Sequence, residues 1–243
     1  MLTPSVLFQR SACFELPVYM TERERLSAKA RVFFDDLWSR GDPWQLETSG
    51  FERDRYTQLS AILHRSHYPC ALEIGCGAGA FTRQLAPRTR RLLALDVSTR
   101  AIAAAQTRYG GLEPIEFRVA NIMDYDPKAE GPWDLIVMSE TIYYLGWLYS
   151  FFDVAWLASE LFAATRDRGQ LLLANTLGDI GDPLLLPCIV RTYRDLFLNV
   201  GYRLVEEKPF CGRKNSIELE VLISLLAKES EPSDSATTSR LHI

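Results

Sequence analysis

Two kinds of hydrophobic pattern alternate along the chain. Over residues 26–38 apolar side chains recur at helical spacing, and Gly41-Asp42-Pro43 then predicts the end of that helix. A second helix is expected over residues 51–64. The short and mostly apolar run 70–74 comes next, and its length and composition are typical of a buried strand. The chain therefore starts with helices and then enters a sheet.

The same alternation continues through the middle of the chain. It predicts helices over 81–85, 99–109 and 151–165, and strands over 92–95, 115–119, 134–138 and 170–174. Because strands that alternate with helices usually pair in parallel, we expect a mostly parallel, doubly wound sheet. The pattern ends with a helix over 186–199 and two strands, 203–207 and 217–226, joined through Gly212. Two late strands with no helix between them predict an antiparallel hairpin at one sheet edge.

These elements predict an α/β fold: a Rossmann-like, seven-stranded, mostly parallel sheet with helices on both faces and an antiparallel edge strand. We expect residues 1–50 to form an N-terminal extension with a helical lid and residues 51–227 to form the α/β domain. Residues 228–243 are rich in polar residues, and a disordered tail is expected there. The aromatic residues of the first helix either pack against the domain or cover its site; they are Phe33, Phe34 and Trp38.

Composition and charge restrict the class of protein. The 243 residues and the formal net charge of −4 fit one globular domain with no overall attraction to nucleic acid. The cysteines are scattered and lack paired Cys-x-x-Cys spacing; they are Cys13, Cys70, Cys76, Cys188 and Cys211. We interpret them as reduced thiols of a cytoplasmic protein. No apolar stretch has the length of a membrane span, so neither membrane insertion nor secretion is expected.

A glycine-rich run joins the first predicted strand to the next helix: Glu73-Ile74-Gly75-Cys76-Gly77-Ala78-Gly79. Residues without a Cβ allow a sharp turn and a close approach of the backbone to a ligand at the carboxyl end of the strand. A dinucleotide fingerprint would read Gly-x-Gly-x-x-Gly, with pyrophosphate at a helix terminus. Here the glycines alternate and an acidic residue precedes them, which favours a cofactor without phosphates.

Polar residues follow the next two predicted strands. Asp96 closes the second strand, where its carboxylate can accept hydrogen bonds from both hydroxyls of a ribose. It could instead cap the helix that begins near Ser98. Asn121 and Ile122 follow the third strand, where the amide can bond an adenine edge and the isoleucine can pack on its face. Cys76 is interpreted as a small filler, because no histidine lies near it in sequence.

The combined spacing of these residues resembles the class I methyltransferase family over residues 51–226. The resemblance implies S-adenosylmethionine as the cofactor, held by residues 51–227 as a methyltransferase domain. It implies that the glycines approach the methionyl and ribose portion, that Asp96 holds the ribose, and that Asn121 and Ile122 frame the adenine, although the family usually has Asp at position 121. The residues expected to bind the cofactor are Trp44, Arg55, Glu73, Gly75, Cys76, Gly77, Gly79, Asp96, Val97, Asn121, Ile122 and Ser139.

The fourth predicted strand delivers residues 139–145 to the same sheet edge, where an acceptor would meet the methyl group. Methyl transfer needs a positioned acceptor atom with a lone pair. Glu140, Tyr143 and Tyr144 are expected to be catalytic: the carboxylate would take a proton from an amine or steady its ammonium, and the tyrosines would orient it. Alternatively, Glu140 holds the methionyl ammonium or a backbone amide, and the tyrosines pack.

A second resemblance is to the nodulation protein S family. It rests on Asp42-Pro43-Trp44-x-x-x-x-Ser49-x-Phe51-Glu52-x-x-Arg55-Tyr56, on the glycine run, and on Glu140-x-x-Tyr143-Tyr144-Leu145. That family N-methylates the deacetylated glucosamine at the non-reducing end of a chitooligosaccharide, which implies an N-methyltransferase with a small polar acceptor, such as an amino sugar or oligosaccharide. The side chains implied at the site are Trp44, Ser49, Arg55 and Tyr56 on the methionyl side, and Trp147 with Tyr149 against a sugar ring. Trp133 and Trp156 are expected to pack, and packing is the alternative for Trp147.

Three other functions stay open at this point. An O-methyltransferase of a secondary metabolite would use the same cofactor with a different acceptor. A non-catalytic protein that binds S-adenosylmethionine would keep the glycine loop, and a nicotinamide-dependent dehydrogenase would bind NADH instead. No metal is expected, because no cluster of metal ligands stands near residues 139–145. The sequence leaves the acceptor atom and the oligomeric state open.

Overall fold

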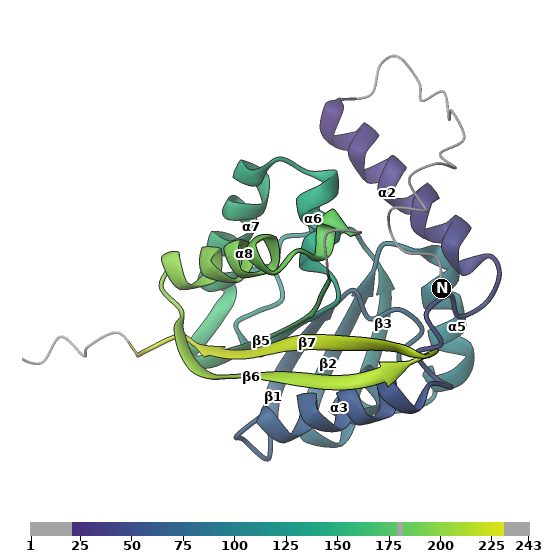
Figure 1. Cartoon of the computed structure of the whole chain (residues 1–243). Helices are drawn as coiled ribbons and strands as arrows, with labels where there is room; N and C mark the ends of the chain where they lie inside the picture. Colours follow the sequence, from purple (N-terminus) through teal and green to yellow (C-terminus); the bar gives the residue numbers. More distant parts are fainter. Residues whose placement is uncertain (1–20, 179–181, 231–243) are drawn as a thin grey trace, which may run out of the picture.

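The computed structural model describes residues 21–178 and 182–230, which form one seven-stranded sheet with helices on both faces (Figure 1). The strand order is β3-β2-β1-β4-β5-β7-β6. The strands are β1 Tyr68–Ile74, β2 Thr89–Asp96, β3 Ile115–Val119, β4 Trp133–Ser139, β5 Thr165–Leu177, β6 Arg203–Lys214 and β7 Ile217–Ala227. The helices are α2 Glu22–Trp38, α3 Gly50–Ile62, α4 Thr82–Leu85, α5 Thr99–Tyr109, α6 Ile142–Leu148, α7 Phe151–Ala164 and α8 Pro187–Asn199, with 3-10 turns η2 Ala86–Arg88 and η3 Pro183–Leu185. The predicted fold class is confirmed.

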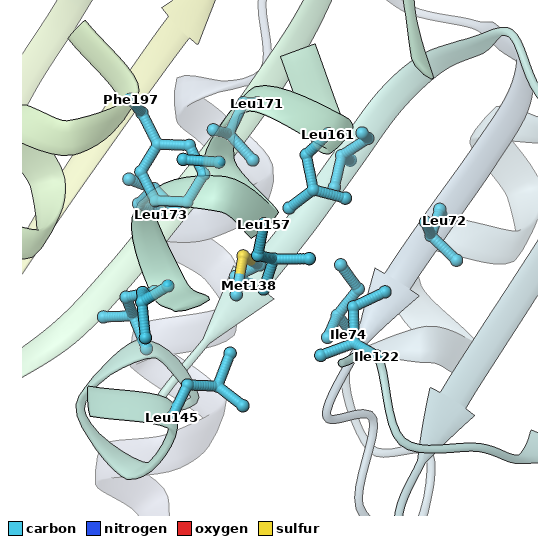
Figure 2. Close-up of a cluster of buried hydrophobic side chains, with 14 of the residues drawn as sticks. Leu72, Ile74, Ile122, Met138, Leu145, Leu157, Leu161, Leu171, Leu173 and Phe197 are labelled. Atoms are coloured by element: carbon cyan, nitrogen blue, oxygen red, sulfur yellow. The ribbon is translucent and has the colours of Figure 1, made fainter. Parts of the chain in front are cut away.

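Two apolar layers hold the helices on the sheet. On one face Leu157 of α7 and Phe197 of α8 pack against Met138 and other strand residues (Figure 2). On the other face Leu59 of α3 and Leu85 of α4 pack against the same sheet. The central strands are covered on both sides, which explains why they read as nearly continuous apolar runs in the sequence.

The predicted hairpin at the sheet edge is confirmed, but its turn lies elsewhere. Strand β7 runs antiparallel to both β5 and β6. Strand β6 continues past Gly212 to Lys214, and the chain reverses at Asn215 and Ser216, whose φ angles are 48° and 67°. Gly212 instead lies inside β6 against Phe51, where an added Cβ would come within 2.8 Å of the ring. The hairpin is therefore longer than the pattern predicted.

Helix α2 lies next to α5 (Figure 1), and its Ala30 belongs to the apolar layer that contains Leu157 and Phe197. It begins at Glu22, earlier than predicted, because Thr21 and Glu24 form a capping box. Asp35 of α2 accepts a hydrogen bond of 2.7 Å from the hydroxyl of Ser98, the residue that caps α5. A polar contact thus fixes this helix beside the sheet.

Helix α6 is an element that the sequence pattern did not predict. It has seven residues, nearly all buried, so no amphipathic period marks it. Residues 1–20 of the expected N-terminal extension, which include Cys13, and residues 231–243 of the expected tail lie outside the described residues. Within the ranges 21–178 and 182–230, no helix combines the length and hydropathy required to cross a membrane.

Candidate active site

A cavity of about 1220 Å³ lies at the carboxyl ends of the parallel strands. Helices α2 and α3, the glycine loop and the segments that follow β2, β3 and β4 form much of its wall. The last residues of β6 and the first residues of β7 also line it. The predicted residues that line it are Trp44, Arg55, Tyr56, Glu73, Gly75, Cys76, Gly77, Asp96, Val97, Asn121, Ile122, Ser139, Glu140, Tyr143, Tyr144 and Tyr149. The fold thus brings most of the predicted site residues into one cavity.

The glycine loop is held tightly at the end of β1. Gly75 and Gly77 have φ angles of 76° and 55°, a region that favours glycine. The amides of Gly75 and Cys76 both donate to the carbonyl of Leu95 on β2, at 2.8 and 2.9 Å. A Cβ at Gly75 would overlap the hydroxyl of Thr141, so the loop has no room for a side chain there. The turn that the glycines were predicted to make is present.

Two residues of the predicted site, Gly79 and Ser49, are not among the described residues that line the cavity. A Cβ at Gly79 would lie 3.0 Å from the rings of Phe117 and Tyr109. Close packing under α5 is therefore enough to require the third glycine, and its contact with the cofactor stays a prediction. Ser49 precedes α3 and makes no side-chain capping bond.

Asp96 and Glu73 place two buried carboxyl groups beside the glycine loop. Each oxygen of Asp96 accepts one backbone hydrogen bond, from Gly77 N at 2.9 Å and from Ser98 N at 2.8 Å. Burial raises the pKa of Asp96 to about 6. Burial, together with the charge of Asp96, raises the pKa of Glu73 to about 8, so Glu73 is neutral at pH 7 in this state. Burial and these two carboxyl groups also raise the pKa of the Cys76 thiol, which agrees with its predicted role as a filler.

Asn121 forms a polar junction between β3 and α2. Its Nδ2 donates to the hydroxyl of Tyr149 at 2.5 Å and to the hydroxyl of Ser27 at 3.0 Å, and its Oδ1 accepts from Met123 N at 3.1 Å. Both amide protons are therefore used by the protein. A ligand could therefore bond this amide only by donating a hydrogen bond to Oδ1. The predicted contact with adenine is thus limited to an N–H group of the base.

Glu140 follows β4 and has a φ angle of 55°, a strained conformation for a residue with a side chain. Its Oε1 accepts from Arg55 at 2.7 Å and from the Thr176 hydroxyl at 2.9 Å. Its Oε2 accepts from the Tyr143 hydroxyl at 2.8 Å and from Thr176 N at 3.2 Å. A carboxylate offers about four lone-pair sites, and all of them have donors here. The geometry therefore disfavours the predicted role of general base and favours the alternative in which Glu140 holds a backbone amide.

Tyr143 and Tyr144 lie on α6 with their ring centroids 4.6 Å apart, and both line the cavity. Burial, and then the nearby charge of Glu140, raises the pKa of both phenols. They stay protonated at neutral pH and cannot act as bases, and the only hydroxyl proton of Tyr143 is already donated to Glu140. Tyr144 also packs edge to face on Phe34 of α2, at 5.1 Å, so this helix forms part of the cavity wall.

Arg55 is the centre of a series of ion pairs that we call the buried charge chain: Lys214, Glu52, Arg55 and Glu140. Arg55 contacts Glu140 at 2.7 Å and Glu52 at 2.6 Å, and the side chains of Arg55 and Glu52 are only 4% and 5% exposed. Glu52 also pairs with Lys214, whose ammonium donates to the carbonyl of Trp44 at 2.6 Å. The buried charge chain links β6 to the loop before α3, to α3 itself and to the segment after β4.

Three tryptophans and a tyrosine have environments that test their predicted roles. Trp133 is fully buried and donates to Pro127 O at 2.7 Å, so its packing role is confirmed. Trp156 is 61% exposed, so its predicted packing role is wrong. Trp147 packs edge to face on Phe33, at 5.0 Å, and is not among the described residues that line the cavity. Tyr149 lines the cavity but is only 6% exposed and bonded to Asn121, which does not suit stacking on a sugar.

Several lining residues were missed by sequence reasoning. Glu52 and Lys214 belong to the buried charge chain, and Thr176 supplies two of the four bonds to Glu140. Glu52 stood inside the Phe51-Glu52-x-x-Arg55 motif, but its partner Lys214 lies 162 residues away. No local signal marked Lys214, because β6 carries charged residues along its length, among them Arg203, Glu206 and Lys208.

Comparison with known proteins finds one family along more than half of the chain. Residues 20–152 match the family model of nodulation protein S (NodS). Curated nodulation S proteins of Sinorhizobium fredii and Bradyrhizobium diazoefficiens are 40% and 41% identical over 105 residues, or 43% of this chain. These matches span 48% and 49% of the relatives, so the chain covers about half the length of the curated relatives that it matches.

Similarity to solved structures extends further along the chain. The crystal structure of the N-methyltransferase NodS from Bradyrhizobium japonicum WM9 in complex with S-adenosyl-L-homocysteine superposes with a TM-score of 0.69 and 25% identity. It covers 83% of this chain and 99% of that one. The family model includes the glycine loop, Asp96 and the acceptor segment that were picked out above. This chain belongs to the nodulation protein S family.

Proposed function

We propose that this chain is an S-adenosylmethionine-dependent N-methyltransferase that acts on the amino group of a small polar acceptor. The observation that carries the proposal is the cavity, in which the glycine loop, Asp96 and the buried charge chain offer separate partners for the parts of that cofactor. The solved NodS structure with S-adenosyl-L-homocysteine supports the same assignment by similarity.

Asp96 fits the ribose of the cofactor. Each carboxylate oxygen already accepts one backbone N–H, from Gly77 or from Ser98, and a carboxylate oxygen has capacity for about two bonds. One acceptor site therefore remains on each oxygen, which matches two neighbouring hydroxyl groups. The backbone bonds also fix the orientation of the carboxylate before a ligand arrives.

Three buried polar atoms suit the amino-acid end of the cofactor. Arg55 Nε, Glu73 Oε2 and Ser139 Oγ belong to residues that line the cavity, and no described residue forms a hydrogen bond with any of the three atoms. Buried polar atoms of this kind cost free energy unless a ligand or water bonds them. We assign Arg55 Nε to the carboxylate, and Glu73 Oε2 with Ser139 Oγ to the ammonium, whose charge would favour ionisation of Glu73.

The chain's own part in the reaction is to orient the acceptor and to exclude water. When bound, S-adenosylmethionine supplies a methyl group on a positively charged sulfur. Glu140, with its lone pairs filled, positions Tyr143 and Arg55 and is not the base in this proposal. The phenols of Tyr143 and Tyr144 orient the acceptor along the line of displacement.

The charge of the cavity favours an amine as the acceptor. Its acidic lining residues are Glu52, Glu73, Asp96, Glu140, Asp182, Glu218 and Glu220, whereas its basic ones are Arg55, Arg213 and Lys214. An excess of carboxylates attracts a cationic ligand to the cavity. The bound ammonium must then lose its proton to solvent, because only the neutral amine has the lone pair that forms the new bond to the methyl carbon. As the finer proposal we name an amino sugar, with the deacetylated end of a chitooligosaccharide as the first compound to test.

Two measurements test this function. Isothermal titration with S-adenosylhomocysteine should give saturable binding, whereas NADH should give none, and the opposite result would replace the methyltransferase by a dehydrogenase. The full chain with S-adenosylmethionine should then add one methyl mass to a deacetylated chitooligosaccharide. It should leave the N-acetylated oligosaccharide and simple phenols unchanged. Methylation of phenols alone would establish an O-methyltransferase, and binding without transfer to any acceptor would favour a non-catalytic protein.

A further inference from the structure

We propose that Lys214 is a positioning residue that sets the charge at the amino-acid end of the cofactor site, acting through Glu52 on Arg55. The inference rests on the proposed function, because its ligand is the carboxylate of S-adenosylmethionine or S-adenosylhomocysteine. It assigns a role to the β6–β7 hairpin, which lies outside the residues that match the family model.

Lys214 is built into the site and is not a surface lysine. It is the last residue of β6, its side chain is only 5% exposed, and it is among the residues that line the cavity. Its ammonium pairs with Glu52, donates to the carbonyl of Trp44 at 2.6 Å and lies 5.9 Å from the centre of the Phe51 ring. A buried lysine in such a place depends on its charged partner.

The shared partners make the effect of Lys214 electrostatic. Glu52 forms ion pairs with both Lys214 and Arg55. Arg55 forms ion pairs with both Glu52 and Glu140. The buried charge chain therefore contains two cations and two anions and has no net charge. Without the lysine ammonium the buried charge chain would carry one net negative charge. This charge would lie next to the Arg55 guanidinium, which we propose binds the ligand's carboxylate. Repulsion in a buried site is screened weakly, so the ligand would bind less tightly.

The direct test compares Lys214→Met with Lys208→Met in the full chain by isothermal titration. Lys208 lies on the same face of β6, is half-buried, and is not among the described residues that line the cavity. Lys214→Met should weaken S-adenosylhomocysteine binding by about tenfold or more, and Lys208→Met should leave it unchanged. Binding of 5′-methylthioadenosine, which lacks the amino-acid group, should be unchanged in both variants. Equal loss of both ligands in Lys214→Met would mean a structural role and overturn the proposal, as would no loss.

Glu52→Gln gives a prediction of opposite sign. It removes one anion from the buried charge chain, so it should tighten S-adenosylhomocysteine binding or leave it as it is. The double variant Glu52→Gln with Lys214→Met has no net charge in the chain and should bind within about threefold of the parent protein. If all three variants lose affinity alike, the charge argument is overturned. The double variant also keeps the test valid if Lys214→Met alone does not fold, because it leaves no unpaired buried charge from this pair.

Failure of this inference differs from failure of the proposed function. If the parent protein binds no S-adenosylhomocysteine, the proposed function itself is wrong. If the parent protein binds it and the Lys214→Met variant binds it equally well, only the role of Lys214 is wrong.

Discussion

The two ends of the cavity are built in different ways. At the end that we propose for the nucleoside, Gly75, Gly77 and Asp96 come from two neighbouring strand ends. The amide of Gly75 donates to the backbone of β2, and the amide of Gly77 donates to the Asp96 carboxylate. At the amino-acid end, Arg55 is held by side-chain ion pairs to Glu52 and Glu140, which come from separate segments. The first end depends on the conformation of one short loop, whereas the second depends on the tertiary fold.

This difference predicts how each end of the cavity responds to substitution. A Cβ added at Gly75 or Gly77 meets both an unfavourable φ and an occupied volume, so a single change destroys the geometry. In the buried charge chain a single change leaves a charge without its partner, and a second, compensating change can restore the balance. The nucleoside end should therefore be intolerant of substitution, and the amino-acid end should show compensation.

The largest effect is expected for Gly75→Ala. The φ of 76° and the overlap with the Thr141 hydroxyl both oppose the added methyl group, and S-adenosylhomocysteine affinity should fall more than about 100-fold. Gly41→Ala is the matched control, because Gly41 also has a positive φ, 93°, but no heavy atom within 4 Å of its added Cβ. Both affinities can be measured by isothermal titration. Equal losses in the two variants would show that strain alone, and not the cavity, is responsible.

Asp96→Asn should have the next largest effect, about 30-fold in S-adenosylhomocysteine affinity at pH 7.5, because one acceptor oxygen is replaced by a donor. The pH dependence follows from the raised pKa of about 6. Above this pH Asp96 is ionised and, in the proposed site, would accept both ribose hydroxyls. Below it the carboxyl is protonated, so affinity of the parent protein should fall as pH drops through about 6.

The check is a titration series from pH 5 to pH 7.5. The Asp96→Asn variant should lack the fall near pH 6, and a parallel fall in both proteins would assign it to another group. Glu73, whose pKa is raised to about 8, is mostly protonated in this window, and a pH dependence that comes from it is present in both proteins.

Glu140→Gln should lower kcat about tenfold, because the amide nitrogen would face a donor that the carboxylate now accepts from. If Glu140 is a positioning residue, the pH profile of kcat keeps its shape. A base would behave differently, and its removal should abolish the acidic limb of that profile. A changed profile would therefore restore the role of base that the sequence predicted.

The smallest effect is expected for Trp147→Ala, within about twofold in kcat/KM for an oligosaccharide acceptor, by analogy with substitutions away from a binding surface. Trp147 packs on Phe33 and is not among the described residues that line the cavity. A loss above tenfold, confined to KM for oligosaccharides, would instead support the stacking role first predicted for this ring.

Local features were the ones that could be predicted. The bounds of α5 and β3 agree with their predicted ranges, since each is a short segment with a clear period. Gly75, Gly77 and Asp96 could be picked out in the sequence because a sharp turn after a strand requires glycine at positions with a positive φ, and Asp96 ends the neighbouring strand. Gly79 shows the limit of that reasoning, because packing against Phe117 requires a glycine as strictly as a ligand does.

The sequence by itself determined the fold class, the family and the glycine loop with Asp96 beside it. Each of these depends on residues that are close together along the chain, where steric rules and periodicity act directly. Only the tertiary structure decided that Lys214 meets Glu52, that Glu140 has no lone pair to spare, and that Trp147 packs away from the cavity. Pairing between distant side chains depends on strand register and helix packing, which no local pattern in one sequence records.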